Sequence, residues 1–141
     1  MTIATITPPI VLSIAGSDTS GGAGVQADTK TISACGAYAM TAITALTAQG
    51  PDGVRAVWPV TTEQLGKQIE AALVYRPAVI KVGMLGNAEL ANVVADILEN
   101  HPHIPLVLDT VSRASSGATL LDAAGVQVLR ERLLPRATII T

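Results

Sequence analysis

The residues most able to do chemistry in this chain are polar groups crowded around a glycine-rich turn near its start. Residues 15–30 read AGSDTSGGAGVQADTK, in which hydroxyl and carboxylate side chains precede closely spaced glycines and a helix-forming segment. Gly21, Gly22 and Gly24 lack a Cβ, so the backbone can adopt left-handed angles there and approach a ligand closely. The helix that follows would point N–H groups at the same place. The pattern indicates a small-molecule site, although glycines alone more often mark an ordinary strand-to-helix turn.

Three further polar side chains lie where they could serve the same site. Gln49 follows the second strand-like run, and its amide offers the donor and acceptor needed to read a ring nitrogen beside an amino group, or it is simply a turn glutamine. Asp28 lies one helical turn beyond Gly24, where it could accept a hydrogen bond from a ligand or stay a solvated charge. Asp109 ends a strand, where it could hold a hydrated cation that bridges phosphate oxygens or cap the next loop.

Other reactive side chains are better explained by packing. Lys81 stands on a strand with no phosphate-binding loop before it, so we expect its stem to pack and its amine to reach a carboxylate at the sheet end. His101 and His103 flank a proline without metal-ligand spacing, which argues against a metal site. Cys35 is the only cysteine, so it forms no intramolecular disulfide, and we expect it to be buried late in a helix.

The elements that must position these residues alternate between strand-like and helix-like patterns, which predicts a single α/β domain over residues 1–141. The expected fold is a doubly wound, mainly parallel sheet with helices on both faces. Thr61 and Gln64 form a capping box, and Asn87 is a good helix N-cap. The expected strands are 10–15, 40–46, 54–60, 78–82, 105–109 and 137–141, and the expected helices are 24–35, 126–134 and those that begin after Thr61 and Asn87.

Composition narrows the class of protein. The chain has 141 residues, of which 49% are hydrophobic and 14% charged, and its formal net charge is −2. The absence of a Lys/Arg cluster and the scarcity of aromatic residues argue against a nucleic-acid surface. No stretch approaches the length of a membrane-spanning helix, and the first residues lack the basic region of a signal peptide. These features predict a cytoplasmic protein.

Residues 15–30 closely resemble the opening of the bacterial hydroxymethylpyrimidine/phosphomethylpyrimidine kinases of thiamin biosynthesis, members of the ribokinase-like superfamily. Further matching segments follow in the family's order, namely GAY at 36–38, TALTAQ at 44–49, KVGML at 81–85, VLDTV at 107–111 and RLLP at 132–135. Family members are longer and continue into a nucleotide-binding half. The resemblance therefore implies a truncated ribokinase-like fold.

The resemblance also implies a reaction, the ATP-dependent phosphorylation of 4-amino-5-hydroxymethyl-2-methylpyrimidine and of its monophosphate, with Mg²⁺ as cofactor. Gln49 would hold the aminopyrimidine, and Asp109 would be the acid on the magnesium and phosphate side. The remaining residues carried over to the pyrimidine pocket are Gly16, Ala23, Asp28, Met84 and Val111. Because the family's catalytic turn lies in its other half, we expect the isolated chain to be inactive.

One departure from the family pattern and two alternative functions qualify this expectation. Ser115 stands where the family has a lysine, a change that puts phosphate handling in doubt although Arg113 could partly substitute. One alternative is a non-catalytic pyrimidine- or pyridoxal-binding remnant. The other is a dinucleotide-binding oxidoreductase, because residues 22–27 fit the loose fingerprint, but Asp18 would repel a pyrophosphate and no acid ends the second strand.

The same resemblance leads to an expectation about partners. The family fold places a covering helix and further strands beyond the last strand-like segment. Without them we expect an exposed apolar region near Leu133, Leu134, Ile139 and Ile140. We therefore expect either a homo-oligomer, such as a dimer, or a second chain that supplies the missing half.

Overall fold

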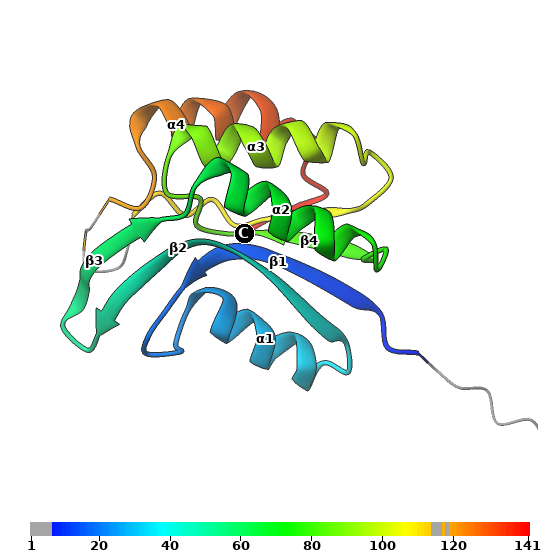
Figure 1. Ribbon diagram of the computed structural model, residues 1–141, viewed down its shortest axis with the longest axis horizontal. Helices are drawn as coiled ribbons and strands as arrows, with labels where there is room; N and C mark the ends of the chain where they lie inside the picture. Colours follow the sequence, from blue (N-terminus) through cyan, green and yellow to red (C-terminus); the bar gives the residue numbers. More distant parts are fainter. Residues whose placement is uncertain (1–6, 114–116, 118) are drawn as a thin grey trace, which may run out of the picture.

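A six-stranded sheet with the strand order β3-β2-β1-β4-β5-β6 forms the centre of the molecule (Figure 1). The computed structural model describes residues 7–113, 117 and 119–141. The elements are β1 Ile10–Ser17, α1 Gly24–Ala34, β2 Tyr38–Gly50, β3 Gly53–Pro59, α2 Thr62–Leu73, β4 Val79–Val82, α3 Ala88–Glu99, β5 Leu106–Leu108, α4 Ala123–Val128 and β6 Ile139–Ile140. A π-helical turn, Leu129–Leu133, and a 3-10 turn, Leu134–Arg136, continue α4.

The connections between strands reverse direction at β1. The chain first steps from β1 to β2 on one side and later returns to β4, β5 and β6 on the other side. Neighbouring strands are parallel throughout the described sheet except β2 and β3, which form an antiparallel hairpin. This confirms the doubly wound, mainly parallel α/β prediction. In such a sheet the ligand crevice lies beyond the carboxyl ends of the strands at the reversal point, here β1 and β4.

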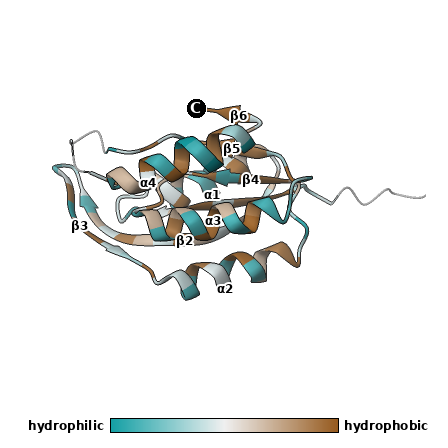
Figure 2. Cartoon of the chain, turned by 90° about the horizontal axis from the view of Figure 1, so that it is seen from above, coloured by the Kyte–Doolittle hydropathy of each residue, from teal (hydrophilic) through white to brown (hydrophobic). Residues whose placement is uncertain are grey.

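One face of the sheet carries the apolar core. Helices α2, α3 and α4 cover it together (Figure 1), and both α2 and α3 alternate hydrophilic and hydrophobic residues along their length (Figure 2). Leu12 and Ile14 of β1 and Ile80 and Val82 of β4 point into this layer and are essentially buried. The two strands contribute every second residue, as a pleated strand requires.

The other face is covered by α1 alone and is more polar. Val25 is the one fully buried residue of α1, a helix described at every position. On β1 and β4, the residues between the core positions are Ser13 and Lys81, which are register partners in the β1–β4 pair. Polar side chains therefore lie between the sheet and α1, directly beneath the carboxyl ends of the two strands.

The helix starts predicted from capping are confirmed. The Thr61 side chain accepts from the Gln64 N–H while the Gln64 side chain accepts from the Thr61 N–H, and the Asn87 side chain accepts from the Leu90 N–H. Each cap satisfies N–H groups that the first turn of a helix leaves unpaired.

Several other details of the prediction are wrong. The second strand runs on to Gly50 because it pairs with β3 in a hairpin, and the last helix begins at Ala123 because Asp122 caps it through the Gly125 N–H. The final strand is shortened to Ile139–Ile140. Cys35 is exposed rather than buried, since it is the C-cap of α1 and its backbone N–H turns back to the Thr31 carbonyl.

Candidate functional site

A cavity of about 640 Å³ opens at the carboxyl ends of β1 and β4. It brings together segments that are far apart in the sequence. The lining residues are Ala15, Gly16, Ser17, Asp18, Ala23, Gly24, Thr47, Gln49, Gly50, Pro51, Asp52, Gly53, Val54, Lys81, Met84, Asp109, Val111, Arg113 and Leu120. Of the residues proposed from the sequence, Gly16, Ala23, Gln49, Met84, Asp109 and Val111 line this cavity, and Asp28 does not.

The glycine-rich turn is shaped by close backbone contact. Gly24, the first residue of α1, has φ +58°, and a Cβ at this position would overlap the carbonyl oxygen of Gly16. Gly21 also has a positive φ, of +71°. Gly22 does not, and a Cβ there would make only ordinary contacts, so of these three glycines only Gly21 and Gly24 use the left-handed angles that the sequence allows. The turn therefore needs glycine most where α1 starts beside the end of β1.

Asp18 holds this turn together from within. Its carboxylate is buried and accepts hydrogen bonds from the Ser20 N–H at 2.9 Å, the Ser20 hydroxyl at 2.8 Å and the Ala23 N–H at 2.8 Å. Burial alone raises the pKa of Asp18, but the hydrogen bonds from the Ser20 side chain and from the backbone N–H groups outweigh it, so the pKa lies below its ordinary value. The carboxylate is therefore charged at neutral pH and serves as the acceptor around which the loop folds.

Hydroxyl groups tie the turn to β2. The Thr19 hydroxyl donates to the Thr47 carbonyl at 2.6 Å, and the Thr47 hydroxyl donates to the Ser17 carbonyl at 2.9 Å. Gln26 ties the turn to α1, because its side chain accepts from the Asp18 N–H and donates to the Ser17 hydroxyl. Thr47 and Gln26 were missed in the sequence, where nothing distinguishes them from other polar residues of a strand and a helix. The one signal for Thr47 was its place two residues before Gln49.

Gln49 lies inside β2 rather than after it. It pairs with Val54 of β3, and a register shift between Ala48 and Gln49 marks a bulge in the hairpin. A bulge adds twist and redirects side chains at the end of a strand pair. Gln49 is half-buried and borders the cavity, and no other described residue hydrogen-bonds its amide. Within the part of the chain that the structure describes, both the donor and the acceptor of this side-chain amide are available to a ligand.

Met84 and Gly16 shape an apolar part of the wall. A Cβ at Gly16 would lie 3.0 Å from the Met84 sulfur, so glycine leaves room for the methionine side chain. The Thr44 hydroxyl donates to the Met84 carbonyl at 2.7 Å and fixes the backbone there. Val111 and Ala23 border the same cavity from the loop after β5 and from the glycine-rich turn.

Asp28 lies behind the cavity, between the sheet and α1. Its carboxylate accepts from the Ser13 hydroxyl at 2.5 Å and pairs with the Lys81 ammonium at 3.0 Å. The Lys81 ammonium lies 3.9 Å from Asp109 at the sheet end, as expected, but its nearer partner is Asp28 of α1. Lys81 itself borders the cavity. Asp28 can therefore influence a ligand through Lys81, a route that the sequence did not suggest.

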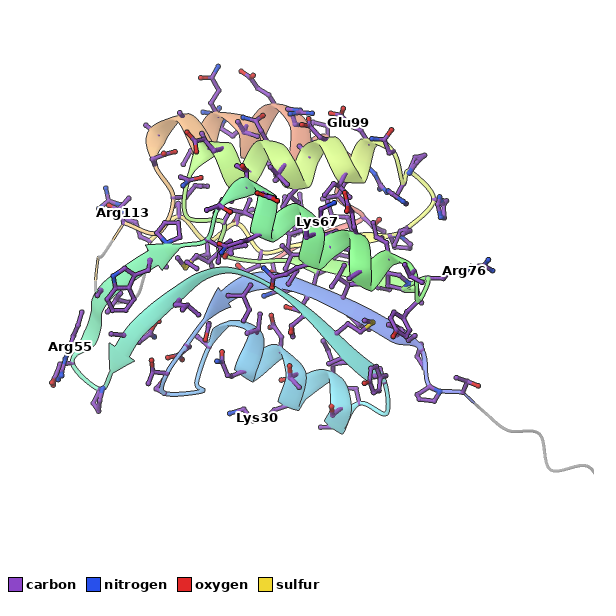
Figure 3. The ribbon with its side chains drawn as sticks, in the orientation of Figure 1. Lys30, Arg55, Lys67, Arg76, Glu99 and Arg113 are labelled. Carbon is purple, nitrogen blue, oxygen red and sulfur yellow. The ribbon has the colours of Figure 1, made fainter. Side chains whose placement is uncertain are left out.

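Arg113 borders the cavity from the loop that follows β5. It is exposed and lies at the same end of the molecule as Arg55 of the β2–β3 hairpin, whereas Arg76 lies at the opposite end (Figure 3). Ser115, for which the resemblance suggests a replaced lysine, falls outside the described residues. Over residues 7–113, 117 and 119–141, there is no group of three or more His, Cys, Asp or Glu side chains arranged to hold a metal ion. Within the same residues, no helix has the length and apolar character needed to cross a bilayer.

Comparison with known proteins identifies the family of this chain. The family model for phosphomethylpyrimidine kinase matches residues 18–141. The chain belongs to the phosphomethylpyrimidine kinase family. Hydroxymethylpyrimidine/phosphomethylpyrimidine kinase from Haemophilus influenzae is 47% identical over 132 residues, which cover 93% of this chain and 49% of the relative. The enzyme of the same name from Bacillus subtilis is 45% identical over 131 residues, covering 92% of this chain and 48% of the relative.

Solved structures of vitamin kinases share the fold. The phosphomethylpyrimidine kinase of Clostridium difficile superposes with a TM-score of 0.87 at 42% identity, covering 94% of this chain and 58% of that chain. The pyridoxal kinase of Staphylococcus aureus in complex with pyridoxal gives 0.84 at 34% identity, covering 95% and 48%. The chain thus spans about half the length of the curated relatives it matches. Family membership confirms the resemblance and replaces the oxidoreductase alternative that residues 22–27 had left open.

Proposed function

We propose that this chain forms the pyrimidine-binding side of a kinase that phosphorylates hydroxymethylpyrimidine and its monophosphate with ATP. The observation that carries the proposal is the convergence of Gly16, Ala23, Gln49, Met84, Asp109 and Val111 on one cavity at the reversal point of the sheet. These residues come from separate strands and loops, and they are the residues that the family resemblance assigns to the pyrimidine pocket and the phosphate side.

The cavity offers complementary chemistry to an aminopyrimidine. The Gln49 amide can donate to a ring nitrogen while accepting from the adjacent amino group. Met84 and Val111 provide apolar contact for the faces of the ring, and Gly16 gives the Met84 side chain the room it occupies. A mostly apolar pocket with a few placed polar groups is the usual form of a small-molecule site.

The family's use of ATP and magnesium belongs to the same proposal. Asp109 is a half-buried carboxylate at the cavity, and oxygen ligands of this type suit Mg²⁺. It would hold a magnesium ion directly or through water, and that ion neutralises phosphate charge when bound. The relative from Staphylococcus aureus, solved with AMP-PCP and pyridoxal, is a kinase that binds an ATP analogue.

Calorimetric titration of the 141-residue chain with hydroxymethylpyrimidine tests the assignment of Gln49. In Gln49→Ala we expect affinity to fall about tenfold or more, because unpaired donor and acceptor atoms of a buried ring cost about 1–3 kcal/mol. Gln127→Ala is the matched control, since Gln127 is exposed on α4 and hydrogen-bonds Glu131. Equal affinities of wild type and Gln49→Ala would remove Gln49 from the site.

Pyridoxal is the second candidate ligand. The specific observation in its favour is the similarity to the Staphylococcus aureus pyridoxal kinase, which was solved with pyridoxal bound. The same titration with pyridoxal in place of hydroxymethylpyrimidine discriminates the two. Binding of pyridoxal without binding of hydroxymethylpyrimidine would transfer the proposal to that ligand.

We also propose that the chain associates with a partner along β6, either a second copy or a chain that supplies further elements of the fold. Within the described sheet β6 is an edge strand, and its Ile139 and Ile140 side chains are 54% and 55% exposed. Leu134 is half-buried nearby, whereas Leu133 is fully buried in the core and does not contribute to this surface, contrary to expectation. An edge strand offers unpaired backbone N–H and C=O groups to another chain, and the exposed isoleucines offer apolar surface that a partner could bury.

Sedimentation velocity at micromolar concentration tests this association. We expect wild type to sediment as a species larger than a monomer, and Ile139→Lys to shift it toward a monomer because a charged edge disfavours strand pairing. The control is Lys30→Gln, since Lys30 lies on α1 and not at the β6 edge of the sheet. A single monomeric boundary for wild type would contradict the proposal.

A further inference from the structure

Three side chains form a polar unit beneath the cavity floor. Ser13 of β1 is fully buried and donates to Asp28 of α1 at 2.5 Å. The Lys81 ammonium of β4 lies 3.0 and 3.2 Å from the two oxygens of the same carboxylate. Ser13 and Lys81 are register partners on adjacent parallel strands, so their side chains lie side by side on the face that α1 covers, and both contact the Asp28 carboxylate. The Asp28 carboxylate thus fixes the position of the Lys81 ammonium.

The backbone next to Lys81 is adapted to its side chain. A Cβ on Gly83 would lie 2.7 Å from the Lys81 ammonium and 3.2 Å from the Ala15 Cβ. Any larger residue at position 83 would therefore displace the ammonium from its place. The ammonium end is not sealed in, because the Lys81 side chain is 21% exposed and borders the cavity.

Within the described residues, the hydrogen-bonding capacity of this ammonium is incompletely used. A lysine ammonium has three N–H donors. Among the described residues its hydrogen-bond partner is Asp28, and the Asp109 carboxylate at 3.9 Å lies beyond hydrogen-bond distance. Lys81 and Asp109 therefore present a donor and an acceptor, side by side, to the same cavity.

A hydroxyl group matches this pair. A hydroxyl both accepts and donates, and its oxygen can lie about 2.8 Å from each of two atoms. The Lys81 nitrogen and the nearer Asp109 oxygen are 3.9 Å apart, so one hydroxyl oxygen can lie within hydrogen-bond distance of both. We propose that Lys81 and Asp109 bind the hydroxyl of the ligand, with Lys81 donating and Asp109 accepting, while Asp28 and Ser13 act as positioning residues for Lys81. This rests on the proposed function, in which the hydroxyl is that of hydroxymethylpyrimidine.

The test is a calorimetric cycle that removes the hydroxyl from the ligand and the ammonium from the protein. The ligands are hydroxymethylpyrimidine and its deoxy analogue, which carries a methyl group in place of the hydroxymethyl group. Wild type should bind the hydroxymethyl compound about tenfold more tightly, the effect of a hydrogen bond to a charged group. Lys81→Met should bind both ligands equally, with the affinity of wild type for the deoxy analogue retained.

Matched variants separate a direct role from a loss of folding. Lys67→Met removes an exposed lysine that pairs with Glu70 on α2 (Figure 3) and should keep the full preference. Asp28→Asn should reduce the preference partly, because it loosens the ammonium without removing it, and Asp109→Asn should reduce it by removing the charged acceptor. Thermal melting of each variant reports folding independently, and Asp109→Asn carries the test if Lys81→Met does not fold.

The outcomes distinguish this inference from the function beneath it. Binding of both ligands by wild type with equal affinity, or a preference that survives in Lys81→Met, would overturn the hydroxyl site and leave the pyrimidine site intact. If Lys81→Met does not fold, an undiminished preference in Asp109→Asn would likewise overturn it. Binding of neither ligand by wild type would overturn both the hydroxyl site and the proposed function.

Discussion

The two faces of the sheet differ in what holds them together. On the face covered by α2, α3 and α4, the strands contribute fully buried aliphatic side chains such as Leu12 and Ile80. On the face covered by α1, the neighbouring positions are Ser13 and Lys81, which bind Asp28 through a hydrogen bond and an ion pair. Adjacent residues of one strand therefore serve stability and the site separately, because a strand directs them to opposite faces.

Substitutions on the two faces should therefore have different effects. Apolar burial is non-directional and tolerates adjustment, whereas the α1 face depends on specific contacts such as that between Gly24 and Gly16. Changes on the apolar face should lower stability and leave ligand preference unaltered. Changes on the α1 face should alter the turn and the cavity.

The largest effect is expected from Gly24→Ala. The new Cβ would overlap the Gly16 carbonyl oxygen, and φ at this position is +58°, so we expect a loss of more than about 4 kcal/mol in the free energy of unfolding. Gly36→Ala is the matched control, since Gly36 has φ +79° but no atom within 4 Å of its would-be Cβ, and it should cost only about 1–2 kcal/mol. Urea unfolding of the two variants measures the difference. Similar losses would show that backbone contact does not hold the α1 face.

An intermediate effect is expected from Ile80→Ala on the apolar face. Ile80 is fully buried beside Lys81, and its truncation should cost about 3 kcal/mol through lost burial and a cavity. The preference for the hydroxymethyl ligand over its deoxy analogue should stay as in wild type, measured by calorimetry below the melting temperature. A changed preference in Ile80→Ala would mean that the two faces are coupled.

A smaller, pH-dependent effect is expected from Asp18→Asn. Because the hydrogen bonds to Asp18 hold its pKa below the usual value of 3.8, the carboxylate adds stability at pH values above 3.8, and this is lost as the pH falls through the folded-state pKa. At neutral pH Asp18→Asn should cost about 1–2 kcal/mol, and this difference should shrink in acid. Thermal melting of both proteins between neutral and acidic pH measures it. A difference that stays constant with pH would assign the effect to packing.

The sequence predicted the fold well where local signals carry it. The capping pairs at Thr61 and Asn87 are local, and so are the alternating strand and helix periods that established a doubly wound sheet. The prediction failed where contacts between elements determine the length of a strand or the exposure of a side chain. Strand β2 extends to Gly50 because β3 pairs with it, and Cys35 is exposed because α1 ends there.

The candidate site divides in the same way. The cavity residues Gly16, Gln49 and Met84 were predictable through family resemblance, because their motifs keep their order in the chain. The position of Asp28 behind the cavity was not, because it depends on which residues of β1 and β4 face α1. Sequence spacing places Asp28 on the same helix face as Gly24, but only the strand register brings Ser13 and Lys81 to its carboxylate.

The alternation of Ile80, Lys81 and Val82 along β4 also guards the protein against a folding error. A slip of one residue in the pairing of β4 would exchange the faces of all its side chains. It would drive the Lys81 ammonium into the aliphatic layer under α2 and α3, away from Asp28, and an unpaired charge in such surroundings is strongly unfavourable. The same lysine that borders the ligand cavity thereby makes the misaligned sheet unstable, so that assembly proceeds to one register.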